Sequence, residues 1–125
     1  MKMTASQEDY LEMVSFLSEQ NESVRVTAIA AELGFSKPSV TAALKLLEEK
    51  SLIKHERYGD IQLTEKGRAL AAEIRQKHEV LTAFLHEVLG VNKKTAEQDA
   101  CKMEHVLSDE TFTKLKKFVA KTGTS

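Results

Sequence analysis

Several residue types are scarce in this chain of 125 residues, and each shortage excludes a class of protein. A single cysteine cannot form an internal disulfide, which is typical of a reducing compartment. No apolar run approaches the roughly 18 residues that a membrane span needs. The first nine residues are polar and acidic, unlike the apolar centre of a signal peptide. We therefore expect a cytoplasmic protein with no membrane segment.

Aromatic residues make up only 6% of the chain, and tryptophan is absent. The apolar residues are mostly Leu, Val, Ile, Ala and Met, which favours a helical protein. The net charge of -1 argues against a protein that binds nucleic acid by bulk charge. Acidic residues gather in residues 1–24, however, and residues 25–75 are mildly basic. A local footprint for a polyanion therefore remains open in the middle of the chain.

Apolar residues recur at helical spacing in six segments: 6–20, 28–33, 36–50, 64–89, 93–107 and from 108 onward. We expect Ser6 and Thr27 to cap the first two helices, and Ser36 to cap the third. Gly34 and Gly90 suit the ends of helices. Residues 52–57 and 60–63 flank a glycine turn and predict a short β-hairpin.

A short helix, a tight turn and a second helix form a helix-turn-helix pattern, and the hairpin that follows makes it a winged helix. The second helix begins with small hydroxyls and a lysine, which fit a major groove and donate hydrogen bonds to phosphates and base edges. A cation at the hairpin tip suits a backbone or minor-groove contact. The candidate DNA-binding residues are Thr27, Ser36, Lys37, Pro38, Ser39, Thr41, Lys45, Arg57, Tyr58 and Gly59.

Three predicted helices place metal-ligand residue types beside their apolar faces. These residues are Asp9, Glu12, His78, Cys101, Glu104 and His105. Taken singly, each is more often an ordinary surface or core residue. Burying them together without a cation would be costly, and a divalent metal removes that cost. Mixed O, N and S donors suit Mn(II), Fe(II), Co(II), Ni(II) or Zn(II).

The strings "SQEDYLE", "IAAELGFSKPSVTAALKLLEEKSLI", "ERYGDIQLTEKG" and "CKMEHVLSDET" resemble the DtxR/MntR family of metal-dependent transcriptional repressors. The resemblance covers nearly the whole chain. It implies a mainly α fold, with a winged helix-turn-helix DNA-binding domain in residues 1–74 and a helical metal-binding and dimerisation domain in residues 75–125. It also implies a homodimer on a palindromic operator in double-stranded DNA, with Mn(II) or Fe(II) as co-repressor.

Carried over residue by residue, the family's metal ligands point to the same six positions. Asp9 and Glu12 resemble manganese-type members. Cys101 stands where those members have a glutamate and where iron-type members have a cysteine. Thr82 and Glu97 occupy two positions that hold an acid and a histidine in the iron type. Since threonine is a poor ligand, the resemblance implies that an ancillary iron-type site is altered or absent.

Two other functions compete with the metal-dependent repressor. One is a winged-helix regulator that senses oxidation or a small molecule through Cys101 without metal. The other is a small metal-dependent hydrolase that uses the same cluster, although the sequence shows no nucleophile with a paired base. We therefore expect a protein that is not an enzyme.

Overall fold

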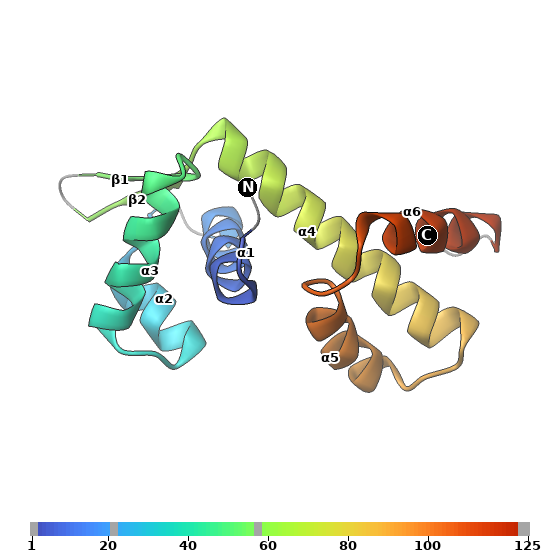
Figure 1. The fold of residues 1–125 in the computed structure, drawn as a ribbon. Helices are drawn as coiled ribbons and strands as arrows, with labels where there is room; N and C mark the ends of the chain where they lie inside the picture. Colours follow the sequence, from blue (N-terminus) through green and yellow to red (C-terminus); the bar gives the residue numbers. More distant parts are fainter. Residues whose placement is uncertain (1–2, 21–22, 57–58, 123–125) are drawn as a thin grey trace. The chain divides into compact units, whose positions relative to one another are not determined.

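The computed structural model describes residues 3–20, 23–56 and 59–122. The chain divides into two compact units, Met1–Ala72 and Glu73–Ser125. The elements run in the order α1, α2, α3, β1, β2, α4, η1, α5 and α6 (Figure 1). This order confirms the predicted helix-turn-helix with a hairpin behind it, followed by further helices. No helix among the described residues is long and apolar enough to cross a membrane.

The first unit is a three-helix cluster with a two-stranded sheet. Its elements are α1 (Ala5–Gln20), α2 (Val26–Leu33), α3 (Lys37–Glu49), β1 (Ile53–His55), β2 (Ile61–Leu63) and the start of α4 (Glu65–Ala83). The strands pair antiparallel, with Ile53 opposite Leu63 and His55 opposite Ile61. Helix α1 contacts α2, α3 and β2. The core is built from one face of each helix and from the strand starts: Leu11, Val14, Ile29, Val40, Leu44, Leu47, Leu52 and Ile61.

The second unit contains the rest of α4, the π-helical turn η1 (Phe84–Val88), α5 (Lys93–Met103) and α6 (Asp109–Lys121). Both α5 and α6 contact η1. Asn92 and Ser108 cap α5 and α6, because each side chain accepts a backbone N–H in the first turn of its helix. Gly90 has a φ of 77°, as the predicted helix stop requires.

The caps of the first two helices differ from the prediction. Helix α1 begins at Ala5, and Thr4 rather than Ser6 starts it: Gln7 N–H donates to Thr4 Oγ1 at 3.1 Å, and Thr4 N–H donates to Gln7 Oε1 at 3.2 Å. This reciprocal pair is a capping box. Thr27 caps nothing, since α2 starts one residue earlier, at Val26, with Arg25 as its N-cap.

Two predicted helix lengths also differ. Helix α5 stops at Met103, so Glu104 and His105 lie in a turn rather than along a helix reaching residue 107. The long helix changes at Phe84 to π-helical hydrogen bonding, which periodicity cannot reveal because both helix types keep apolar residues on one side. The first difference alters how the candidate metal ligands are held.

Candidate metal centre and nucleic-acid interface

Helix α3 has one buried apolar side and one exposed polar side. Ser36 caps it, accepting the N–H of Ser39 at 3.3 Å, and Pro38 occupies the first turn. Val40, Leu44 and Leu47 are fully buried, whereas the predicted DNA-binding residues of α3 are exposed: Lys37, Pro38, Ser39, Thr41 and Lys45. The helix therefore presents small hydroxyls and two cations on its solvent side, a surface that fits a major groove.

The hairpin behind α3 is anchored to the chain segment that precedes α2. Ile61 N–H donates to the Val24 carbonyl at 2.8 Å, and Ser23 Oγ donates to Asp60 Oδ1 at 2.7 Å. Gly59 has a φ of 92°, a conformation that favours glycine in the turn. The predicted DNA-binding residues Arg57 and Tyr58 lie outside the described residues. The sequence reasoning missed Ser23 and Asp60, because no local pattern joins positions this far apart.

The second unit brings three of the six candidate metal ligands together. Glu104 is only 3% exposed. Its Oε1 lies 3.8 Å from Nδ1 of His78 on α4 and 3.9 Å from Nε2 of His105. Two donor atoms that each bind one ion at about 2.1 Å stand at most about 4.2 Å apart. Both nitrogen–oxygen separations are therefore within reach of a single divalent ion.

The environment of this cluster fits a cation. Glu104 is the one buried charged residue among those described, and burying a carboxylate is costly unless positive charge or donors compensate it. The side chain of His105 is 7% exposed and that of His78 is 33% exposed. One carboxylate oxygen and two imidazole nitrogens match the ligand preferences of first-row divalent metals. The residues present thus fit the metal that the sequence predicts.

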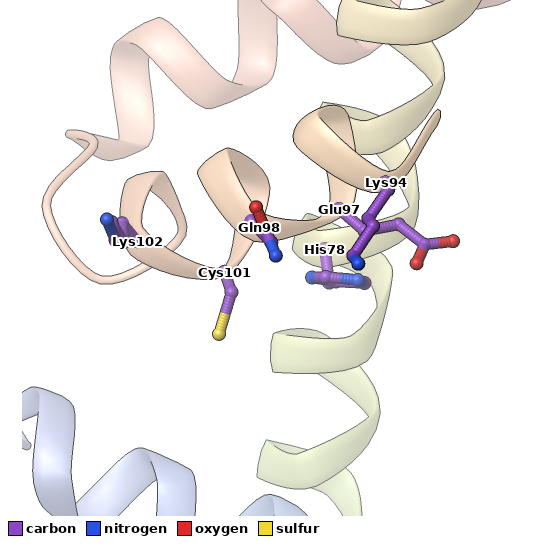
Figure 2. Close-up of a pocket in the computed structure, with 6 residues that line it drawn as sticks. All are labelled: His78, Lys94, Glu97, Gln98, Cys101 and Lys102. Atoms are coloured by element: carbon purple, nitrogen blue, oxygen red, sulfur yellow. The ribbon is translucent and has the colours of Figure 1, made fainter. Parts of the chain in front are cut away.

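Cys101 is exposed. It lines a hollow of about 650 Å³ together with His78 and four α5 side chains: Lys94, Glu97, Gln98 and Lys102. In Figure 2 the Cys101 sulfur points away from the α5 backbone. Cys101 and His78 therefore share one hollow, while Glu104 sits in the protein interior.

Thr82 and Glu97 border a second hollow of about 360 Å³, also beside His78. Thr82 Oγ1 is buried, and among the described residues it has no hydrogen-bond partner. A neutral hydroxyl adds little to cation binding. The expectation that an ancillary site at Thr82 is altered or absent stays a prediction.

Asp9 and Glu12 stand three residues apart on α1, in the first unit. Asp9 is exposed and Glu12 is half-buried. The structure therefore groups His78, Glu104 and His105 in one unit and places the two α1 acids in the other. The complete six-residue ligand set stays a prediction.

The first unit is a winged helix whose recognition helix is rich in hydroxyls. The second unit is helical and holds a carboxylate–imidazole cluster. Together they define a class, the DNA-binding proteins that carry a divalent metal. Known proteins identify the family. Residues 2–61 match the DNA-binding domain of the iron-dependent repressors, and residues 64–125 match their metal-binding and dimerisation domain. The chain belongs to the DtxR/MntR family of metal-dependent transcriptional repressors of manganese or iron homeostasis.

Individual relatives agree with this assignment. An HTH-type transcriptional regulator of Methanocaldococcus jannaschii is 42% identical over 95% of this chain and 96% of its own. The transcriptional regulator MntR of Escherichia coli is 38% identical over 93% of this chain and 74% of its own. The structure of the manganese regulator SloR is 30% identical with a TM-score of 0.80, over 96% of this chain. The chain spans about half the length of SloR, 55%.

These matches decide several predictions. The mainly α, winged-helix fold is confirmed, and so is the expectation of a divalent metal cofactor. The family binds DNA and dimerises. Its members are transcriptional regulators and not enzymes, which confirms the expectation of no enzymatic activity and removes the hydrolase alternative.

Proposed function

We propose that this chain, as a homodimer, represses genes of manganese or iron homeostasis by binding a palindromic operator in the cytoplasm, with Mn(II) or Fe(II) as co-repressor. The observation that carries this proposal is the buried Glu104 carboxylate with His78 and His105 nitrogens at 3.8 and 3.9 Å. A structural core has little use for this group of polar side chains. A ligand shell in a DNA-binding family accounts for it.

We assign six ligands to the metal: Asp9, Glu12, His78, Cys101, Glu104 and His105. When bound, the metal would supply the positive charge that three carboxylates require. Three of the four ligands in the second unit, His78, Glu104 and His105, provide a partly formed shell. Asp9 and Glu12 would join α1 to that shell, so metal binding would order the helix that packs on the recognition helix. Co(II), Ni(II) and Zn(II) match the same donor types and would substitute.

On DNA, the first turns of α3 would enter the major groove. Ser39 and Thr41 offer hydroxyls to base edges or phosphates, and Lys37 and Lys45 offer charge to phosphates. Arg57, Tyr58 and Gly59 of the hairpin, and Thr27 of α2, would contact the flanking backbone. A two-fold dimer would place two recognition helices in successive major grooves, which calls for a palindromic site. Metal and operator binding would then strengthen each other equally.

The test needs a DNA probe that does not presuppose the operator. Duplexes are selected from a random library with the protein and Mn(II). The dissociation constant of the best duplex is then measured with Mn(II), with Fe(II) under anaerobic conditions, and with EDTA. We expect metal to tighten binding by roughly 5- to 150-fold. Lys37→Ala should weaken binding while leaving metal affinity unchanged. Equal affinity with metal and with EDTA would reject the proposal.

A second candidate rests on the exposure of Cys101, which lines a hollow together with Lys94 and Lys102. In this alternative, oxidation or a small molecule at Cys101 controls DNA binding without metal. Cys101→Ser would then abolish the response, and EDTA would have no effect. In the metal-dependent repressor, EDTA abolishes the response and Cys101→Ser only weakens it.

A further inference from the structure

Within the first unit, one hydrogen bond joins the helix of the two candidate metal ligands to the end of the recognition helix. The Lys50 ammonium donates to Gln7 Oε1 at 2.7 Å, in a partly buried position. Gln7 lies on α1, two residues before Asp9, and Lys50 is the C-cap of α3. The two residues are 43 positions apart in sequence, so the bond is a tertiary link between helices.

The Gln7 end of this link also holds the beginning of α1. The same Oε1 accepts the backbone N–H of Thr4 at 3.2 Å, and Gln7 N–H donates to Thr4 Oγ1. One amide oxygen thus serves both the capping box of α1 and the ammonium of Lys50. Fraying of the first turn of α1 would release Lys50, and ordering of that turn would fix it.

The Lys50 end is held firmly. Ser51 follows Lys50 with a φ of 63°, and Leu52 N–H donates to the Leu47 carbonyl at 3.0 Å, which is a Schellman ending of α3. Lys66 Nζ donates to the Lys50 carbonyl at 3.1 Å, and Thr64 Oγ1 donates to the Ser51 carbonyl at 2.7 Å. The backbone from which Lys50 reaches toward α1 is therefore set by the α3–β1 turn and the start of α4.

We propose that the Gln7–Lys50 hydrogen bond transmits metal binding at α1 to the recognition helix α3, and that both residues are positioning residues that touch neither metal nor DNA. The inference rests on the proposed function. Ordering of α1 around Asp9 and Glu12 fixes the Gln7 side chain. Gln7 then holds the C-terminal end of α3 through Lys50, which narrows the orientations of its DNA-facing N-terminal turns.

Three variants separate the link from its surroundings. Lys50→Met keeps the aliphatic stem, removes the donor and leaves the capping box intact. Gln7→Met removes the acceptor without changing the charge. Gln7→Glu keeps an acceptor for both Lys50 and Thr4 N–H, so it should preserve coupling. Thr4→Ala removes the other half of the capping box, and Lys54→Met removes an exposed cation elsewhere. Lys54→Met controls for charge loss, and Thr4→Ala measures how far fraying of the first turn of α1 alone lowers the coupling.

The DNA duplex is one that the wild-type chain selects in the presence of Mn(II). For each variant, the dissociation constant of this duplex is measured without and with Mn(II), and the ratio of the two constants gives the coupling. Amide hydrogen exchange of residues 5–12 is followed without DNA. We expect Lys50→Met and Gln7→Met each to lower the ratio several-fold toward one, leaving metal-free DNA affinity within about threefold. The double variant should couple no worse than Gln7→Met, because the Gln7–Lys50 bond is lost in all three variants.

A purely structural role predicts a different result. The variants would then weaken metal-free and metal-bound DNA binding equally, and the ratio would stay at the wild-type value, which would overturn the proposal. Reduced coupling in Lys54→Met to the same extent would also overturn it, since charge rather than the link would be responsible. A wild-type ratio of one would instead reject the proposed function, and the link with it. In the supported case, Mn(II) protects residues 5–12 from exchange less in Lys50→Met than in the wild type.

Discussion

The two units of the chain differ in how much apolar material they bury. Of the buried apolar residues that the structure describes, thirteen belong to residues 1–72 and five to residues 73–125. The second unit also contains Glu104, the one buried charge among the described residues. Apolar burial contributes about 25 cal/mol per Å², so the first unit has the larger intrinsic driving force. We therefore predict that metal and a partner subunit stabilise the second unit more than the first.

The distribution of tyrosine makes this comparison measurable. Both tyrosines, Tyr10 and Tyr58, belong to the first unit, and there is no tryptophan. Tyrosine fluorescence therefore follows unfolding of residues 1–72, whereas far-ultraviolet circular dichroism follows all helices. If the units differ in stability as their cores do, the unfolding midpoints from fluorescence and from circular dichroism should differ in metal-free protein. The two midpoints should approach each other when Mn(II) is added.

The largest effect is expected at Gly67, in the first turn of α4. A Cβ at this position would lie 1.9 Å from the Leu52 carbonyl oxygen, which already accepts the N–H of Thr64. Gly67→Ala should destabilise the first unit by about 3 kcal/mol or more, because backbone must move. Urea unfolding followed by tyrosine fluorescence measures this loss.

Gly34→Ala is the matched control for Gly67. Gly34 has a φ of 73°, but an added Cβ meets nothing within 4 Å. Its cost is conformational only, about 1 kcal/mol. Equal destabilisation by the two alanines would show that close packing of α4 on the α3–β1 turn does not limit the stability of the first unit.

The next effect concerns the buried carboxylate of the second unit. Glu104→Gln removes a charged ligand, and we expect Mn(II) affinity to fall roughly 100-fold or more, since even partners outside the ligand shell contribute 10- to 100-fold. Isothermal titration calorimetry measures the affinity. The Mn(II)-induced rise in the circular dichroism midpoint should disappear with it.

Glu110→Gln controls for the loss of a carboxylate on the same unit, because Glu110 is exposed on α6, away from the cluster's hollows. It should leave Mn(II) affinity within about twofold. If Glu104→Gln bound Mn(II) as tightly as the wild type, the buried cluster would be a structural feature, and the stabilisation of the second unit by metal would have to be sought elsewhere.

A smaller effect is expected at Cys101. Thiolate is a soft ligand that favours Fe(II), Co(II) or Zn(II) over Mn(II), and carboxylate reverses the preference. Cys101→Glu should shift the ratio of Mn(II) to Co(II) affinity by about tenfold toward Mn(II). Competition titrations with a metal indicator measure the ratio. An unchanged ratio would indicate that the exposed Cys101 is outside the ligand shell.

The sequence predicted the first unit better than the second because its local signals are strong. Ser36, Pro38 and Gly34 each perform the expected task at a helix end, and the apolar spacing of α3 is reproduced in the buried residues. Thr4 was missed as a cap, although Thr4 and Gln7 have the spacing of a capping box. Ser6 and Asp9 offered a competing pattern, and spacing alone does not choose between them.

In the second unit, the residue types of the candidate ligands were easier to predict than the backbone structure that holds them. The helix was expected to continue through Glu104 and His105, and it stops at Met103. Whether a helix ends there depends on tertiary packing that residue spacing does not encode. His78 and Glu104 meet across 26 positions, which no local pattern shows. The Gln7–Lys50 bond escaped prediction for the same reason.

The smallest effect is expected at the turn that ends α3 in the first unit. Ser51 is the only non-glycine residue of the described chain with a positive φ, 63°, at the point where α3 ends. Ser51→Gly should stabilise the first unit by about 0.5 to 1 kcal/mol, because relief of strain in the folded state exceeds the entropy that glycine adds to the unfolded chain. Ser51→Ala keeps the strain and should give no gain. Urea midpoints from tyrosine fluorescence distinguish the two. A gain from alanine equal to that from glycine would mean that the hydroxyl, and not the backbone conformation, limits the α3–β1 turn.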